Sequence, residues 1–350
     1  MKKELSLMIF LLFLSGFSCF ADEIVKKDTD NDGKIDQIAT FDKKGRIVKL
    51  EIDGNKDGVI DRVQYYKEGQ LVKVEADKNN DGKPDVWDYF ESGKRSKQEQ
   101  AAPETGRINQ IILFDAQERP KTIQKDTLGK GLFDTVYQFG EGRLISVSRD
   151  TDADAKINTW TFYQDDKPVE KREDENGDGR IEKHTFFDAD GQPKEIRTDA
   201  NGDNKPEEIR KYEHGTIVEL KKDPDPNGKY KNVIRFKNGQ PFEQEQDVDG
   251  NGFADIVTRF RDGKTVYQEK DTNADHKMDA YFYFDSQGQL EKCEEDTKYK
   301  GKVDRIKLYR NNDLIKMTWD QDEDGFKEIE LNFKNGKPSL QTEDRNRDGK

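Results

Sequence analysis

Apolar and polar residues alternate in short segments along most of the chain, with the two-residue period of a β-strand. Two such segments, residues 35–41 and 46–51, flank a short polar turn, and the same succession returns many times. The turns commonly close with a glycine, as at Gly69, Gly239 and Gly263, because glycine adopts the positive φ of a tight hairpin without steric cost. The pattern therefore predicts a series of antiparallel β-hairpins.

An acidic loop pattern, D-x-[DN]-x-[DN]-G-x-x-[DE], precedes the hairpins and returns every 24 or 25 residues. Its first position falls at Asp28, Asp53, Asp77, Asp126, Asp150, Asp174, Asp199, Asp223, Asp247, Asp271, Asp296, Asp320 and Asp344, with a degenerate copy at Ala101. Position 14, counted from the same residue, is aromatic: Phe41, Tyr66, Phe90, Phe114, Phe139, Tyr163, Phe187, Tyr212, Phe236, Phe260, Phe284, Tyr309 and Phe333. The extra residue of the longer units lies at the hairpin tip, where an insertion disturbs neither strand register nor loop geometry.

Together these patterns predict an all-β fold, an elongated array of about thirteen antiparallel β-hairpin repeats over residues 22–350 that forms an open meander or superhelical sheet. We expect the acidic loops along one edge of this sheet and the hairpin turns along the other. The alternative is a β-propeller in which two hairpins form each four-stranded blade. We interpret the aromatic column as a thin core; the alternative is an exposed aromatic ladder that binds a glycan or peptide.

Composition excludes several classes of protein. Hydrophobic residues make up 31% of the chain and charged residues 39%, which is too polar for a conventional single-core globule of this length. The net charge of −13 argues against a nucleic-acid partner, because phosphate binding requires a basic surface. The only cysteines are Cys19 and Cys293, so disulfides are not expected to stabilise the mature chain.

The first 21 residues have the pattern of a secretory signal peptide: two lysines, an apolar run from Leu5 to Leu14, and small residues up to Ala21. Cleavage after Ala21 would leave a mature chain that begins at Asp22, which is the processing that we expect. In the alternative, Cys19 carries the lipid of a bacterial lipoprotein and is the only membrane attachment. Both routes predict an exported protein that is periplasmic, on the outer surface or extracellular.

Nine acidic loops keep oxygen ligands at positions 1, 3, 5 and 9, and this donor set suits calcium, which binds six to eight oxygens in flexible geometry. Glycine is common at position 6, where the loop turns sharply. The expected ligands are Asp28, Asp30, Asp32, Asp36, Asp53, Asn55, Asp57, Asp61, Asp77, Asn79, Asp81, Asp85, Asp150, Asp152, Asp154, Asn158, Asp174, Asn176, Asp178, Glu182, Asp199, Asn201, Asp203, Glu207, Asp247, Asp249, Asn251, Asp255, Asp271, Asn273, Asp275, Asp279, Asp320, Asp322, Asp324 and Glu328. The alternative is that these are turn formers stabilised by side-chain hydrogen bonds without a metal.

The loops are not EF-hands, because position 12 holds no glutamate in any of the nine and the flanking segments alternate like strands. The pattern resembles the calcium loops of thrombospondin type 3 repeats and of FG-GAP (VCBS) repeats. The segment Phe41-Asp42-Lys43-Lys44-Gly45-Arg46-Ile47 is similar to the YD repeats of Rhs-type bacterial shells. These resemblances imply calcium binding and β-hairpins, and nothing more specific.

Several copies of the loop have lost ligands. Lys130 replaces one in the loop at Asp126, while Lys298 and Lys300 replace two in the loop at Asp296. We interpret these lysines as ammonium groups that neutralise their own loop internally. The copy at Asp223 ends in Lys231 at position 9.

The chain shows no set of catalytic residues. Its three histidines, His184, His214 and His276, stand at unrelated repeat positions, and no nucleophile, base and orienting group combine with them. We therefore expect a non-enzymatic, calcium-binding structural or adhesive scaffold whose partner is an unidentified protein or glycan. The alternatives are a shell or propeller-like region of a toxin- or hydrolase-related protein, and a glycan- or peptide-binding module that uses the aromatic column.

Overall fold

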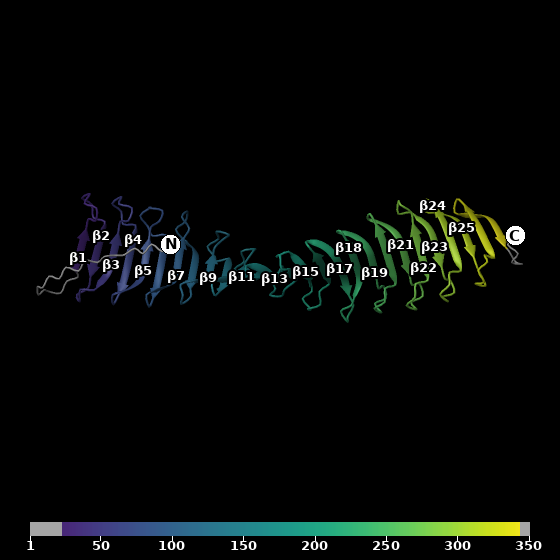
Figure 1. Cartoon of the computed structure of the whole chain (residues 1–350), viewed down its shortest axis with the longest axis horizontal. Coiled ribbons are helices and arrows are strands. Elements are labelled where there is room, and N and C mark those ends of the chain that lie inside the picture. The colour runs from purple at the N-terminus through teal and green to yellow at the C-terminus, as the bar shows by residue number, and fades with distance from the viewer. Residues whose placement is uncertain (1–22, 344–350) are drawn as a thin grey trace. The chain divides into compact units, whose positions relative to one another are not determined.

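A computed structural model describes residues 23–343, which contain 27 β-strands and no helix (Figure 1). The predicted signal peptide and the whole of the loop at Asp344 lie outside the described residues. The chain divides into two compact units between Arg143 and Leu144. The repeat pattern is present in both units, and their organisation as a single array stays a prediction.

The first unit contains strands β1 to β10. Their bounds are β1 (Glu23–Lys27), β2 (Gln37–Phe41), β3 (Ile47–Ile52), β4 (Arg62–Lys67), β5 (Gln70–Ala76), β6 (Val86–Glu91), β7 (Lys94–Ala101), β8 (Ile108–Phe114), β9 (Pro120–Lys125) and β10 (Thr135–Gly140). Each strand pairs antiparallel with the next strand in the sequence.

The second unit contains strands β11 to β27, and its first strand begins at the division between the units. Their bounds are β11 (Arg143–Arg149), β12 (Thr159–Gln164), β13 (Lys167–Glu173), β14 (Lys183–Phe187), β15 (Pro193–Thr198), β16 (Glu208–Glu213), β17 (Thr216–Pro224), β18 (Tyr230–Lys237), β19 (Gln240–Gln246), β20 (Ile256–Arg261), β21 (Lys264–Lys270), β22 (Ala280–Phe284), β23 (Leu290–Glu295), β24 (Arg305–Arg310), β25 (Asp313–Trp319), β26 (Ile329–Lys334) and β27 (Lys337–Glu343). Here too each strand pairs antiparallel with its successor.

This continuous pairing decides between the two predicted architectures. A propeller interrupts the hydrogen-bonded ladder after every four-stranded blade, whereas the ladder within each unit continues through every strand. The prediction of an all-β hairpin array in an open meander is confirmed, and the propeller alternative is wrong.

The geometry of the hairpin tips explains why most turns end with a glycine. In the hairpin of β4 and β5, Lys67 pairs with Gln70, which leaves Glu68 and Gly69 as a two-residue loop with φ of 53° and 81°. Positive φ at both positions is the type I′ geometry that matches the twist of the flanking strands. The aromatic residue at position 14, Tyr66 in this hairpin, follows a shift in strand register beside the tip.

Four hairpins have longer tips that begin with an aspartate. In one of them, Asp42 Oδ1 accepts hydrogen bonds from the backbone N–H groups of Lys44 and Arg46, at 2.8 and 2.9 Å. Asp115, Asp188 and Asp285 accept the same pair of bonds in their hairpins. The extra residue of the longer units thus lies at the tip, as predicted.

The sheet has almost no apolar core. Among the described residues, the fully buried hydrophobic side chains are Leu50, Val74, Val86, Ala101, Val147, Ala280 and Cys293. The position-14 aromatics are only half-buried in every hairpin. This partial burial agrees with a thin core, and binding of a glycan or peptide by the aromatic column stays a prediction.

Cross-strand pairs of charged and aromatic side chains stabilise the sheet in place of a core. Lys73 lies in register between Tyr65 and Tyr89, with its Nζ 5.9 and 5.6 Å from the two ring centroids. Lys97 Nζ lies 4.2 Å from the Tyr89 ring, and the Tyr65 hydroxyl donates to Glu75 at 2.9 Å. Cation–π contacts of this kind contribute about 0.5–1 kcal/mol each at exposed sites, so the sheet needs many of them to offset its lack of a core.

We predict that Val74→Ala, which removes two methyl groups from a side chain that is 3% exposed, destabilises its surroundings by about 2 kcal/mol. Because each strand contacts only its neighbours, the loss should be local. Hydrogen exchange should show lower protection in β4, β5 and β6 and unchanged protection in β20 to β23. Val248→Ala, at a side chain that is 65% exposed, is the matched control and should change neither region. A uniform loss over both regions would contradict the local account.

Candidate metal centres

The acidic loops lie at one end of the strands and the hairpin tips at the other within each unit, as a meander requires and as the sequence predicts. Each loop joins the second strand of one hairpin to the first strand of the next. Successive loops are linked by backbone hydrogen bonds, since the N–H of Asp53, at position 1, donates to the carbonyl of Asp36, at position 9 of the preceding loop (2.8 Å). The same bond joins Asp77 to Asp61 and Asp320 to Asp304.

In most loops the position-1 aspartate accepts two backbone hydrogen bonds and so fixes the course of the loop. Asp53 Oδ1 accepts from the N–H of Lys56 at 2.6 Å, and Oδ2 accepts from that of Gly58 at 2.7 Å. The two donor residues have φ of 65° and 96°, which explains the glycine at position 6. The same two bonds recur at Asp28, Asp150, Asp174, Asp199, Asp247 and Asp271.

The position-9 residue closes the loop by accepting a hydrogen bond from the N–H of position 2. Asp36 accepts from the Thr29 amide at 2.6 Å and also from the Thr29 hydroxyl. These bonds to the hydroxyl and the amide hold the pKa of Asp36 below its usual value. Positions 3 and 5 each accept a bond from the N–H two residues further on, as Asn55 does from Asp57 at 2.9 Å.

The predicted ligands therefore already have a structural role as hydrogen-bond acceptors, which is what the metal-free alternative requires. That role does not account for their charge, because an asparagine at position 3 or 5 accepts the same bond as an aspartate. The metal-free alternative also leaves the electrostatic repulsion between neighbouring carboxylates uncompensated.

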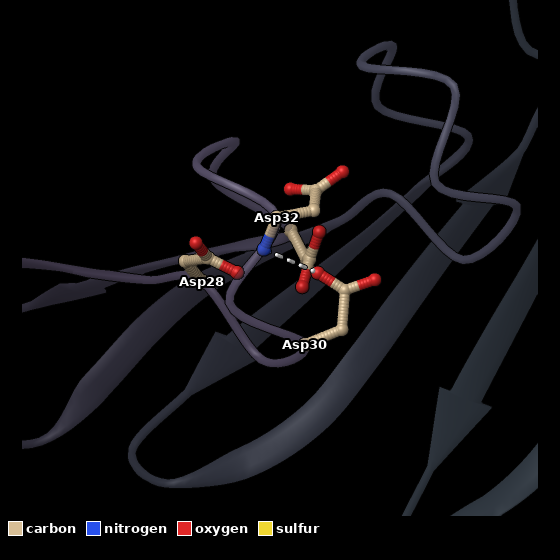
Figure 2. A group of neighbouring side chains, drawn as sticks. Asp28, Asp30 and Asp32 are labelled. Atoms are coloured by element: carbon tan, nitrogen blue, oxygen red, sulfur yellow. Dashed lines mark hydrogen bonds between the residues drawn. The ribbon is translucent and has the colours of Figure 1, made fainter.

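Carboxylate oxygens gather within 4.8 Å of one another in several loops. The groups include Asp28, Asp30, Asp32 and Asp36; Asp320, Asp322, Asp324 and Glu328; Asp150, Asp152 and Asp154; Asp174, Asp178 and Glu182; and Asp199, Asp203 and Glu207. Figure 2 shows Asp28, Asp30 and Asp32 of the first group. All donors in these groups are hard oxygens, which suits calcium and excludes a thiolate-type zinc site.

Burial concentrates on the same residues. Asp53, Asp150, Asp174 and Asp320 at position 1 are 3%, 5%, 5% and 1% exposed, so they are more buried than the aromatic column. In the Asp320 loop, Asp320 Oδ1 and Glu328 Oε1 are buried and have no hydrogen-bond partner. Burying a carboxylate oxygen without a partner costs several kcal/mol of folding free energy unless a cation lies against it. The oxygens of the Asp320 loop therefore suit a divalent ion.

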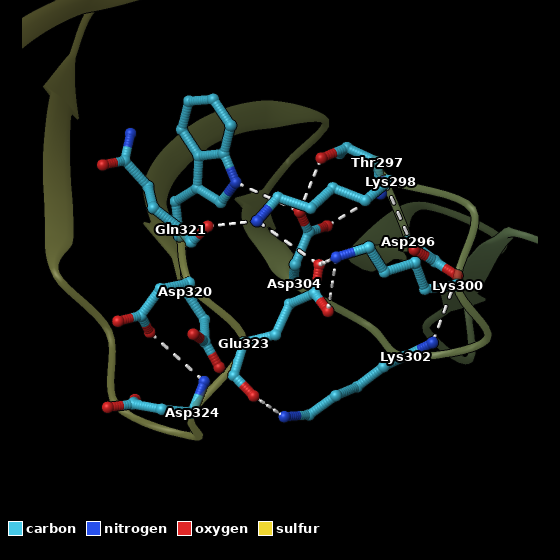
Figure 3. Close-up of polar contacts among 12 residues, drawn as sticks. Asp296, Thr297, Lys298, Lys300, Lys302, Asp304, Asp320, Gln321, Glu323 and Asp324 are labelled. Carbon is cyan, nitrogen blue, oxygen red and sulfur yellow. Dashed lines mark hydrogen bonds and ion pairs between the residues drawn. The ribbon is translucent and has the colours of Figure 1, made fainter.

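Our interpretation that Lys298 and Lys300 neutralise their own loop is wrong. Both side chains extend instead to the following loop, where their Nζ atoms lie 3.3 and 3.1 Å from Glu323 Oε1 (Figure 3). Asp296 keeps the position-1 role through backbone donors, such as the N–H of Gly301. The spacing of lysines within a loop could not reveal this contact, because it depends on how adjacent repeats stack.

Two degenerate copies have become short turns. After β17, Asp225 takes over as the capping residue and accepts bonds from the N–H groups of Asn227 and Lys229, both at 2.8 Å. After β7, Gly106 N–H donates to the carbonyl of Ala102. Neither turn belongs to the acidic clusters described above.

Other reactive side chains are held in structural contacts. Cys293 is 1% exposed, and burial raises the pKa of its thiol to about 11, so the group is protonated at neutral pH. His184 Nε2 lies 2.7 Å from Glu170 Oε1, and the His276 ring stacks on Phe253 at 5.2 Å. Residues 23–343 include no helix that could cross a membrane.

No family model and no curated protein matches the chain. Among solved structures, it is similar to accessory secretory protein 1,2 and 3 in Streptococcus pneumoniae (20% identity, 30% of this chain, 17% of that chain, TM-score 0.17). It is also similar to TcdB2-TccC3 (11% identity, 92% of this chain, 23% of that chain, TM-score 0.20). The chain spans less than a quarter of the length of each of these proteins. TM-scores this low do not establish a shared fold. The hairpin array is shown by the strand pairing, whereas the resemblance to calcium loops and YD repeats stays a prediction.

We predict opposite results for two substitutions in the Asp174 loop. Asp174→Asn replaces one of the two carboxylate oxygens that accept backbone bonds, so that the N–H of Gly177 or Gly179 loses its acceptor. The substitution should therefore destabilise the loop by about 1–2 kcal/mol even in excess chelator. Asn176→Asp keeps the bond from the Asp178 N–H (2.8 Å) and should leave stability in chelator nearly unchanged while strengthening calcium binding. Thermal unfolding with and without calcium measures both effects. Equal stability of wild type and Asp174→Asn in chelator would contradict the assigned role of position 1.

Proposed function

We propose that this chain is an exported, non-enzymatic repeat protein whose acidic loops bind calcium ions and whose sheet acts as a structural or adhesive scaffold. The observation that carries the proposal is the pair of buried, unpartnered oxygens, Asp320 Oδ1 and Glu328 Oε1, within a group of four carboxylates. A bound cation supplies the partner that these oxygens lack.

Electrostatics support an ion in several loops. Many of the buried side chains of the described residues are carboxylates at loop positions 1 and 9, and the chain as a whole carries a net charge of −13. Two carboxylates that lie together in a desolvated site repel strongly, and a divalent ion reverses the sign of that interaction. Each bound ion would thus replace the repulsion between two carboxylates by the attraction of both carboxylates to the ion, at the junction of two hairpins.

The loop geometry favours calcium over magnesium. Four side chains come from one loop, the carbonyl of position 7 would add a fifth ligand, and calcium tolerates such irregular sets of six to eight oxygens. Magnesium demands near-ideal octahedral geometry and gives up its waters reluctantly. We expect affinities of the extracellular type, about 0.1–1 mM, which would keep the loops filled outside the cell.

The scaffold role rests on the architecture. Residues 23–343 form hairpins that contact only their neighbours, and the two free faces of the sheet in each unit are available to a protein or glycan partner. The other predicted roles, as the shell region of a toxin- or hydrolase-related protein or as a glycan-binding aromatic column, gain no specific support.

We predict that the mature chain binds about eight to ten ions at millimolar calcium, one for each of the nine complete loops. Native mass spectrometry of the intact complex counts them directly. The same measurement in magnesium should show fewer bound ions. Two or fewer calcium ions would contradict the proposal and leave the loops as hydrogen-bonded turns.

A further inference from the structure

The residue at position 2 differs between two groups of acidic loops. In one group it is a threonine: Thr29, Thr127, Thr151, Thr272 and Thr297. In each of these loops the threonine hydroxyl donates to the position-9 side chain, which also accepts a backbone N–H. We call this hydroxyl bond the threonine clasp. Position 2 has no hydroxyl in the loops at Asp53, Asp77, Asp174, Asp199 and Asp247.

The threonine clasp closes loops that have lost other ligands. In the Asp296 loop, positions 3 and 5 are lysines, yet the closing residue Asp304 is 0% exposed. Asp304 accepts from the N–H and the hydroxyl of Thr297, at 2.7 and 2.6 Å, and from the Trp319 indole at 3.2 Å. The Asp126 loop, with leucine and lysine at positions 3 and 5, is closed in the same way. Protein donors alone therefore satisfy the closing acid of such a loop.

Two adjacent loops with complete ligand sets show the contrast. The Asp247 loop and the Asp271 loop each have three aspartates and one asparagine at positions 1, 3, 5 and 9. Their closing acids, Asp255 and Asp279, are 7% and 5% exposed. Asp279 Oδ2 accepts the Thr272 N–H at 2.8 Å, and Oδ1 accepts the Thr272 hydroxyl at 2.6 Å. Both oxygens of Asp279 thus have a donor within their own loop.

The closing acid of the Asp247 loop uses only one of its oxygens. Asp255 Oδ2 accepts the N–H groups of Val248 and Asp249, at 2.6 and 3.3 Å, and no residue in the described part of the chain donates to Oδ1. A nearly buried carboxylate oxygen without a protein donor depends on water or a cation. The closing acids of the other loops without a clasp also accept their amide bonds through one oxygen: Asp61, Asp85, Glu182 and Glu207.

We infer that the residue at position 2 determines how far each loop depends on its ion. A threonine there is a positioning residue, which closes the loop through the position-9 side chain when calcium is absent. A loop without the clasp closes fully only around an ion. The inference rests on the proposed function and deepens it, because it separates ion-dependent loops from loops that close by themselves. Since a bound cation also fixes the position-9 side chain, the clasp affects the loop mainly when the ion is absent.

Hydrogen exchange of the mature full-length chain, in excess chelator and in millimolar calcium, tests the inference loop by loop. In chelator, the amides of the Asp247 loop should lose protection while those of the Asp271 loop keep most of theirs. Thr272→Val keeps the shape of the side chain and removes the hydroxyl. In chelator it should speed exchange at Ala274 and His276, whose N–H groups donate to Asp271, by about tenfold, the worth of one hydrogen bond. Thr272→Ser, which keeps the hydroxyl, should exchange as wild type does.

The reciprocal substitution adds a clasp to the adjacent loop. Val248→Thr, at a side chain that is 65% exposed, should slow exchange in the Asp247 loop by a similar factor in chelator. A gain in protection cannot come from misfolding. In saturating calcium, Val248→Thr and Thr272→Val should both exchange as wild type does, because the ion fixes the position-9 side chain. A hydroxyl bond with a purely structural role would change exchange by the same factor in both solutions.

The outcomes separate the inference from the proposed function. Two or fewer bound calcium ions by native mass spectrometry, with equal exchange in calcium and chelator in every loop, would overturn the proposed function itself. Binding of about eight to ten ions, with equal loss of protection in the Asp247 and Asp271 loops on chelation, would overturn the inference alone. The same holds if ions bind but Val248→Thr gains no protection or Thr272→Val changes exchange equally in both solutions.

Discussion

The carboxylate at position 1 of the acidic loops, which is buried in most of them, holds successive hairpins in their arrangement. Asp53 illustrates it: one side chain, 3% exposed, accepts the N–H groups of Lys56 and Gly58 and shapes the loop that joins two hairpins. Its own N–H continues the hydrogen-bonded ladder to Asp36 of the preceding loop. A charged acceptor makes these bonds stronger than a neutral one would, and its charge is the reason that we propose a bound cation.

The sheet explains why so much depends on the loops. Few of its apolar side chains are fully buried, and cation–π and ion-pair contacts such as those of Lys73 with Tyr65 and Glu75 are individually weak. Conformational entropy opposes folding by about 1–2 kcal/mol per residue, so a sheet with little core depends on additional interactions. Ions that bind only the folded loops would add their binding free energy to the stability of the fold.

The sequence predicts those parts of the structure that one repeat determines by itself. The period-two alternation, the glycine at most tips and the acids at positions 1, 3, 5 and 9 are local features, and the strands, type I′ turns and acidic clusters follow from them. Contacts between repeats could not be predicted. Lys56 reaches Asp30 across 26 positions of the sequence, and Lys300 reaches Glu323 across 23, because adjacent loops stack within the length of a lysine side chain. The meander is the arrangement that the sequence favours, but the propeller is excluded only by the ladder that continues from one hairpin to the next, which a single repeat does not reveal.

If ions bind only the folded loops, removing them with a chelator should loosen the fold. Small-angle scattering and thermal unfolding of the mature chain should be compared in millimolar calcium and in excess chelator, with ionic strength held constant. We predict that chelation increases the radius of gyration and lowers the thermal midpoint by more than about 15 °C. An unchanged radius and midpoint in chelator would contradict it, and would show that hydrogen bonds alone hold the acidic loops.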